Sequence, residues 1–145
     1  MKLKTAIIMG FLAMVLLSLT GCPSPPPIPD DNTTSYFDDY AIKKDGNLPI
    51  LECNVRKLSG KVLVFHAAHC GACKIAVPIL QELEQELNMT FKYYDLDVEE
   101  DAAAVRELKL VPYYTPTVII NCKVLIGAKE KGIYKEELEK MLAAQ

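Results

Sequence analysis

The amino-acid sequence predicts an α/β domain with a mixed central sheet of about four to five strands, flanked by helices. Two observations support this fold class. From about residue 48 onward, segments rich in β-branched and aromatic residues alternate with amphipathic segments. The order opens with a strand, a helix and a strand, which favours parallel pairing, and it closes with a hairpin, which is antiparallel.

The first part of the domain is expected to supply the centre of the sheet. Residues 50–53 are a candidate short strand, and residues 61–65 form a continuous apolar run typical of a strand buried on both faces. Apolar residues at helical spacing then predict an amphipathic helix over 75–88. Residues 90–96 are rich in β-formers and predict the next strand.

The second part is expected to close the sheet. Residues 99–108 carry acidic residues in the first turn, followed by alanines, and this pattern predicts a helix. Two apolar runs at 117–120 and 124–126 flank the polar residues 121–123 and predict a hairpin. Residues 134–144 are amphipathic and predict a closing helix.

The N-terminus has the pattern of a secretion signal. Lys2 and Lys4 precede an apolar stretch over 6–19, which is shorter than the roughly 20 residues of a membrane-spanning helix. The stretch ends in the sequence LTGC, which resembles a bacterial lipobox and whose last residue is Cys22. We therefore expect residues 1–21 to be a lipoprotein signal peptide and Cys22 to carry the lipid. An uncleaved anchor with an incidental cysteine is the alternative.

Residues 22–47 are expected to connect the lipid to the domain at 48–145. Most of the chain's nine prolines lie in 23–29, a composition that favours an extended spacer. Residues 36–47 have a mixed pattern and receive no assignment. The lipid implies an extracytoplasmic location on the surface of the cell membrane or the outer membrane, where disulfides persist.

The charge balance excludes one class of partner. The 145 residues contain 16 Lys and Arg against 19 Asp and Glu, a net charge of -3 with no basic block. Proteins that bind nucleic acid electrostatically carry a basic patch, so we expect no nucleic acid partner.

The chemistry is expected at the sequence CGAC, which runs from Cys70 to Cys73 between the buried strand and the following helix. A helix N-terminus stabilises a thiolate, so Cys70 is expected to attack a disulfide and Cys73 to resolve the mixed disulfide. His66 and His69 lie close by in the sequence and could tune the thiolate when protonated. Aromatic packing is the alternative role. For His69 we favour neither tuning of the thiolate nor packing over the other, and for His66 we favour packing.

Residues 61–83 resemble thioredoxin across the CGAC motif and the helix with Pro78, and the TPT sequence at 115–117 resembles the family's cis-proline loop. The resemblance implies a thioredoxin-like fold and a thiol-disulfide oxidoreductase of protein substrates, with a membrane redox donor as further partner and no cofactor. It also implies a cis bond between Thr115 and Pro116 beside the cysteine pair, with the Thr115 main chain binding substrate.

Several positions depart from the family pattern. The two aromatic residues that the family carries before its motif align with His66 and His69. The buried acid of the family aligns with Val64, and its lysine partner with Tyr93. These differences leave the direction of electron flow open, with reduction of substrates favoured.

Two cysteines, Cys53 and Cys122, remain outside the motif. One interpretation is a structural disulfide between them. The other is that the two cysteines lie at opposite ends of the sheet. Both stay open because the sequence does not give the distance between their Cα atoms. Two further hypotheses concern the motif itself. His66, His69, Cys70 and Cys73 could hold zinc or copper, or the motif disulfide could be structural in a non-catalytic interaction module.

Overall fold

A computed structural model of the protein describes residues 38–144. The expected signal peptide, the lipidation site Cys22 and the proline-rich segment lie outside the described residues. Within 38–144, no helix combines the length and the apolar character that crossing a membrane requires.

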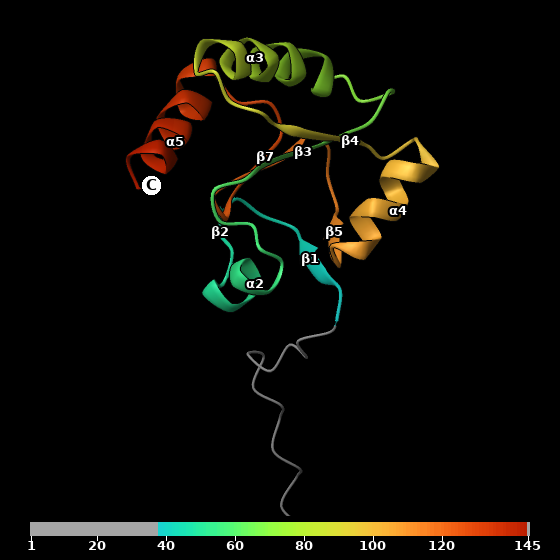
Figure 1. Cartoon of the computed structure of the whole chain (residues 1–145). Helices are drawn as coiled ribbons and strands as arrows, with labels where there is room; N and C mark the ends of the chain where they lie inside the picture. Colours follow the sequence, from blue (N-terminus) through green and yellow to red (C-terminus); the bar gives the residue numbers. More distant parts are fainter. Residues whose placement is uncertain (1–37, 145) are drawn as a thin grey trace, which may run out of the picture. The chain divides into compact units, whose positions relative to one another are not determined.

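A five-stranded mixed sheet forms the centre of the domain, with strand order β2-β7-β6-β3-β4 (Figure 1). β3 and β4 run parallel, while the other neighbouring strands pair antiparallel. This confirms the predicted fold class, including the hairpin of β6 and β7. The strands are β2 at Gly46–Asn47, β3 at Val62–His66, β4 at Lys92–Asp95, β6 at Thr117–Ile120 and β7 at Lys123–Ile126.

Helices cover both faces of this sheet. α3 and α5 pack on one face, where Leu80 of α3 and Leu138 of α5 are fully buried. α2 and α4 supply residues to the core on the other face, including Cys53 and Val105. The helices are α2 at Ile50–Val55, α3 at Cys73–Glu86, α4 at Glu99–Glu107 and α5 at Lys131–Ala143.

Strand β3 is apolar from Val62 to Phe65 because both of its faces are buried there. Successive side chains of a strand point to opposite faces, so Val62 and Val64 lie in the core with α3 and α5. Leu63 and Phe65 lie in the core on the opposite face. Burial of these side chains on both sides holds β3 inside the sheet, between β6 and β4, with its C-terminal end leading into the CGAC segment.

The prediction of a strand at 50–53 was wrong, because these residues form the first turn of α2. The amide of Cys53 donates to the Pro49 carbonyl oxygen at 3.0 Å, which is a helical bond. Glu52 pairs with Arg56 one turn later, and this pair exists only when the segment is helical. Within α2, Glu52 and Cys53 are buried, while Ile50 at its first position is exposed.

Two strands that the sequence did not predict form a small parallel sheet: β1 at Tyr40–Ile42 and β5 at Leu110–Pro112. β1 and β2 lie within residues 22–47, which were expected to be a spacer. The end of that segment is therefore part of the folded domain. Each of these strands is too short to show a period in the sequence, and the β1 and β5 pairing joins residues far apart in the chain.

Candidate functional site

The cysteines of the CGAC motif are joined in a disulfide where the chain passes from β3 into α3. The Cα atoms of Cys70 and Cys73 are 5.2 Å apart. The Cys73 amide donates to the Cys70 sulfur at 3.0 Å. Cys70 is partly exposed, whereas Cys73 is only 3% exposed. The first sulfur is accessible to a partner protein, and the second is enclosed at the start of the helix.

The peptide bond between Thr115 and Pro116 is cis, and it lies beside the disulfide. The Thr115 carbonyl oxygen is 3.3 Å from the Cys70 sulfur. Thr117 opens β6, and its hydroxyl donates to the Tyr114 carbonyl oxygen at 2.6 Å, which fixes the turn that precedes the strand. The structure therefore brings the TPT loop and the CGAC motif together, as the sequence suggested.

His69 lies on the surface and does not pack against other rings. Its side chain is 99% exposed, and its Nδ1 is 3.8 Å from Oδ2 of Asp97. The same carboxylate oxygen accepts a hydrogen bond of 2.8 Å from the Ala68 amide, so Asp97 anchors the loop before Cys70. Of the two roles considered for His69, aromatic packing is excluded. Sequence reasoning missed Asp97, since no local pattern connects it to the motif.

His66 is half-buried at the C-terminal end of β3, and it lies edge-on to the Tyr93 ring with 6.3 Å between ring centroids. His66 also lines a pocket that Cys73, Lys74 and Asp95 line as well. His66 therefore contacts an aromatic ring and also borders the pocket that Cys73 lines.

The positions of the family's buried acid and lysine are occupied by Val64 and Tyr93, which are register partners across β3 and β4. Val64 is completely buried. The Tyr93 hydroxyl donates to Glu84 at 3.2 Å. Burial raises the pKa of the Tyr93 phenol, and the neighbouring Glu84 carboxylate raises it further. This part of the core therefore holds neutral groups in place of an acid and a base.

The proposed metal ligands do not converge. Among residues 38–144, no three His, Cys, Asp or Glu side chains are placed to hold one metal ion. His69 points to Asp97 and solvent, and the two cysteines bond to each other. The geometry gives no support to a metal-binding module.

Cys53 of α2 and Cys122 in the turn between β6 and β7 also form a disulfide, with Cα atoms 5.6 Å apart. β3 pairs antiparallel with β6, so Val62 at the start of β3 lies opposite Ile120 at the end of β6. This second disulfide therefore lies at the end of the sheet where β3 begins, and the redox pair lies at the other end.

Exposed apolar side chains lie next to the TPT loop and next to the CGAC motif in the chain. Tyr113 and Tyr114 directly precede Thr115, and Ile75 follows Cys73 by two residues; all three are exposed. The ammonium of Lys43 lies 4.7 Å from the centroid of the Tyr113 ring. Sequence reasoning did not single out these residues, although two tyrosines before a TPT sequence are a visible signal.

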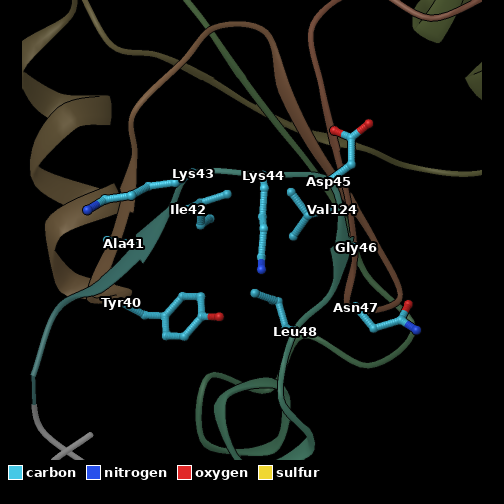
Figure 2. Close-up of a pocket in the computed structure, with 10 residues that line it drawn as sticks. All are labelled: Tyr40, Ala41, Ile42, Lys43, Lys44, Asp45, Gly46, Asn47, Leu48 and Val124. Atoms are coloured by element: carbon cyan, nitrogen blue, oxygen red, sulfur yellow. The ribbon is translucent and has the colours of Figure 1, made fainter. Parts of the chain in front are cut away.

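A separate pocket lies at the N-terminal segment of the domain and is lined by residues 40–48 together with Val124 (Figure 2). The side chains of Lys44 and Leu48 point into the space, while Asp45 points away from it (Figure 2). Asp45 accepts hydrogen bonds from the Ile126 amide and from Lys129. Neither cysteine of the redox motif lines this pocket, so it is not part of the redox site.

Comparison with known proteins shows which family this chain is similar to. The thioredoxin family model matches residues 50–144. The thioredoxin of Mycolicibacterium smegmatis is 35% identical over 92 residues, which cover 58% of this chain and 80% of that protein. The thioredoxin of Bacillus subtilis is 31% identical over 81 residues, covering 54% of this chain and 78% of that protein.

A solved structure of Fasciola hepatica thioredoxin has 25% sequence identity and a TM-score of 0.42, and the match covers 63% of this chain and 90% of that one. The family match spans the CGAC motif, the TPT loop and the closing helix. The chain therefore belongs to the thioredoxin family and is a thiol-disulfide oxidoreductase.

Proposed function

We propose that this protein is a lipid-anchored oxidoreductase that reduces disulfides in extracytoplasmic proteins through Cys70 and Cys73. The observation that carries the proposal is the asymmetry of the pair. The Cys70 sulfur is accessible and lies beside the Thr115 carbonyl, while the Cys73 sulfur is enclosed at the start of α3. An accessible sulfur suits attack on a partner, and an enclosed one suits resolution within the molecule.

The reaction has two exchange steps. The Cys70 thiolate attacks one sulfur of the substrate disulfide, which forms a mixed disulfide and releases the first substrate thiolate. The Cys73 thiolate then attacks the Cys70 sulfur. The bond between Cys70 and the substrate breaks, and the second substrate thiolate leaves. The substrate has gained two electrons, and Cys70 and Cys73 have lost them as their own disulfide. A membrane redox donor would return the pair to the dithiol.

The surroundings of Cys70 support a protein as substrate. The Thr115 main chain lies against the sulfur and can pair with an extended segment of a partner. The exposed Tyr113 and Tyr114, which adjoin Thr115, and the exposed Ile75, which follows Cys73, offer apolar contact area. A substrate peptide held along this surface would present its disulfide to Cys70.

The location and direction rest on sequence features. The signal segment with its LTGC ending supports lipidation of Cys22 and an extracytoplasmic site. The Cys53 to Cys122 disulfide supports an oxidising compartment. The dipeptide Gly71-Ala72 lacks the histidine that strongly oxidising relatives carry, and this supports a reductase.

Reduction of insulin disulfides by the protein, with dithiothreitol as electron source, tests the activity. We expect turnover by the natural sequence, none by Cys70→Ser, and mixed disulfides with substrate proteins trapped on Cys70 by Cys73→Ser. Cys53→Ser combined with Cys122→Ser is the matched control and should retain turnover. A fully oxidised pair that no thiol reduces would instead favour a non-catalytic interaction module. The measured reduction potential then decides between reductase and oxidant.

A further inference from the structure

A pocket of about 350 Å³ lies beside the enclosed sulfur, with His66, Cys73, Lys74 and Asp95 in its lining. We infer that His66 is the group that accepts the proton of the Cys73 thiol when Cys73 resolves the mixed disulfide. This inference rests on the exchange function proposed above and adds to it the residue that makes the second step possible at neutral pH.

The second step needs a proton acceptor because Cys73 is enclosed. A thiol must lose its proton before it attacks, and burial in apolar surroundings disfavours the thiolate. Cys73 is 3% exposed, whereas the first sulfur lies in partial contact with solvent. Cys73 lines the pocket together with the titratable residues His66, Lys74 and Asp95.

The side chains of β3 alternate between the two faces of the sheet, and this alternation places His66 on the face that α3 covers. Val62 and Val64 both lie in the core that α3 covers, and His66 continues the same row by the period of two. The row therefore ends beneath the start of α3, where Cys73 lies. Val64, one step back along this row, is an aliphatic side chain and can accept no proton.

The other titratable groups that face His66 are poorer proton acceptors. Lys74 on α3 has an ammonium that only donates. Asp95 on β4 accepts a hydrogen bond from the Asp97 amide at 3.1 Å, and a carboxylate is a weaker base than an imidazole. Tyr93 on β4 presents its ring edge, and its hydroxyl donates to Glu84. Among the side chains that line this pocket, the imidazole has one ring nitrogen that can accept a proton and a second that can donate one.

The step balances as follows. The Cys73 thiol gives its proton to the neutral His66 imidazole, and the resulting thiolate attacks the Cys70 sulfur of the mixed disulfide. The bond from Cys70 to the substrate breaks, and the electron pair leaves on the substrate thiolate. The imidazolium then returns its proton to that thiolate or to water in the pocket.

A sequential-mixing experiment isolates this step. Reduced protein is mixed at about pH 4 with the aromatic disulfide 5,5′-dithiobis(2-nitrobenzoate), and the first thiolate released reports attack by Cys70. A second mixing raises the pH to values between about 5.5 and 9, and the second thiolate released reports attack by Cys73. Variants His66→Gln and His66→Phe are compared with His69→Gln, the matched control on the exposed histidine.

We expect His66→Gln and His66→Phe to slow the second release at least about tenfold at pH 7 while leaving the first release within about twofold. In the natural sequence the second rate should depend less steeply on pH than in the variants, where the Cys73 thiol must lose its proton without a neighbouring base. His69→Gln should leave the second release unchanged.

Three outcomes separate the possible failures. Absence of the first release would overturn the exchange function itself. A normal first release with an unchanged second release in His66→Gln would overturn the role of His66 alone. A second release restored by His66→Phe, which keeps the ring contact with Tyr93, would show that His66 acts by packing and not as a base.

Discussion

Arg56 and Glu52 form an ion pair in which both side chains are almost fully buried, with 6% and 7% of their side-chain surfaces exposed. The Arg56 guanidinium also donates to the carbonyl oxygens of Lys109 and Asp38. One side chain thus connects α2 with the chain before β1 and with the loop that enters β5. Arg56 therefore contacts the chain just before each strand of the small parallel sheet.

Removing one partner of the pair should destabilise the domain strongly. Arg56→Met leaves the Glu52 carboxylate buried without its partner, and we expect a loss of about 3–5 kcal/mol in the free energy of unfolding. Urea unfolding measures it. The double variant Glu52→Leu with Arg56→Met removes both charges and should recover a large part of the loss. A single variant within about 1 kcal/mol of the natural sequence would contradict the prediction.

The disulfide of Cys53 and Cys122 should contribute much more to stability than that of the redox pair. It joins residues 69 positions apart, whereas Cys70 and Cys73 are 3 apart. Because closing a long loop restricts the unfolded chain more, we expect the double alanine variant of Cys53 and Cys122 to lose about 2–4 kcal/mol. Calorimetry of the oxidised proteins tests this, with the double alanine variant of the redox pair as control. Equal losses in the two variants would be evidence against it.

Alkaline pH should destabilise the fold partly through Tyr93. Its pKa is raised in the folded state, so the unfolded chain loses this proton first, from about pH 10 upward. The stability that Tyr93 contributes is therefore complete below about pH 10 and declines as the pH rises further. Tyr93→Phe should make the decline between about pH 9.5 and 11.5 shallower, as measured by urea unfolding across that range. Tyr113→Phe, which changes an exposed tyrosine, is the control, and its free energy of unfolding should depend on pH as that of the natural sequence does.

The Cys70 thiol of the reduced protein should be unusually acidic. The Cys73 amide points at the Cys70 sulfur in the first turn of α3, and such an amide stabilises a thiolate. We expect a thiol pKa at least about one unit below the ordinary 8.5. The rate of alkylation by iodoacetamide as a function of pH, with the modified residue identified by mass spectrometry, measures it. A midpoint at 8.5 or higher would count against the assignment of Cys70 as the attacking residue.

Tyr114 should affect protein substrates and not small ones. Its exposed ring directly precedes Thr115, which lies against the Cys70 sulfur. Loss of an aromatic contact at an interface commonly costs about 1–2 kcal/mol, so Tyr114→Ala should raise the KM for insulin about five- to thirtyfold. Its rate with a small aromatic disulfide should not change. Ile50→Ala, which removes an exposed side chain from α2, is the control. Equal effects on both substrates would refute this role.

The central part of the fold could be predicted because its signals are local and repeated. The apolar run of β3 and the helical stripe of α3 each extend over several residues, and the CGAC motif lies between them. The contact between Cys70 and the Thr115 loop spans 45 residues, and only the resemblance to thioredoxin pointed to it. Periodicity by itself contains no information about such long-range contacts.

The remaining parts depend on tertiary contacts that short segments do not encode. Residues 50–53 resemble a strand in composition, but the Arg56 contacts favour the helix. β1 and β5 stabilise each other from distant parts of the chain. Whether Cys53 reaches Cys122 depends on where α2 lies, so the sequence left that pairing open. The hydrogen bond from the Ala68 amide to Asp97 spans 29 residues, so no local pattern indicates it.

The two disulfides of this protein lie at opposite ends of the sheet, although they share one small domain. β3 contains five residues, which at about 3.3 Å per residue puts about 16 Å between the reactive pair and the Cys53 to Cys122 bond. A thiolate at Cys70 therefore cannot scramble the structural bond of its own molecule. In the Cys53 to Cys122 bond, Cys53 is 6% exposed while Cys122 is partly exposed, as Cys70 is in the redox pair. Within one molecule, the distance between the two bonds keeps the catalyst from becoming its own substrate.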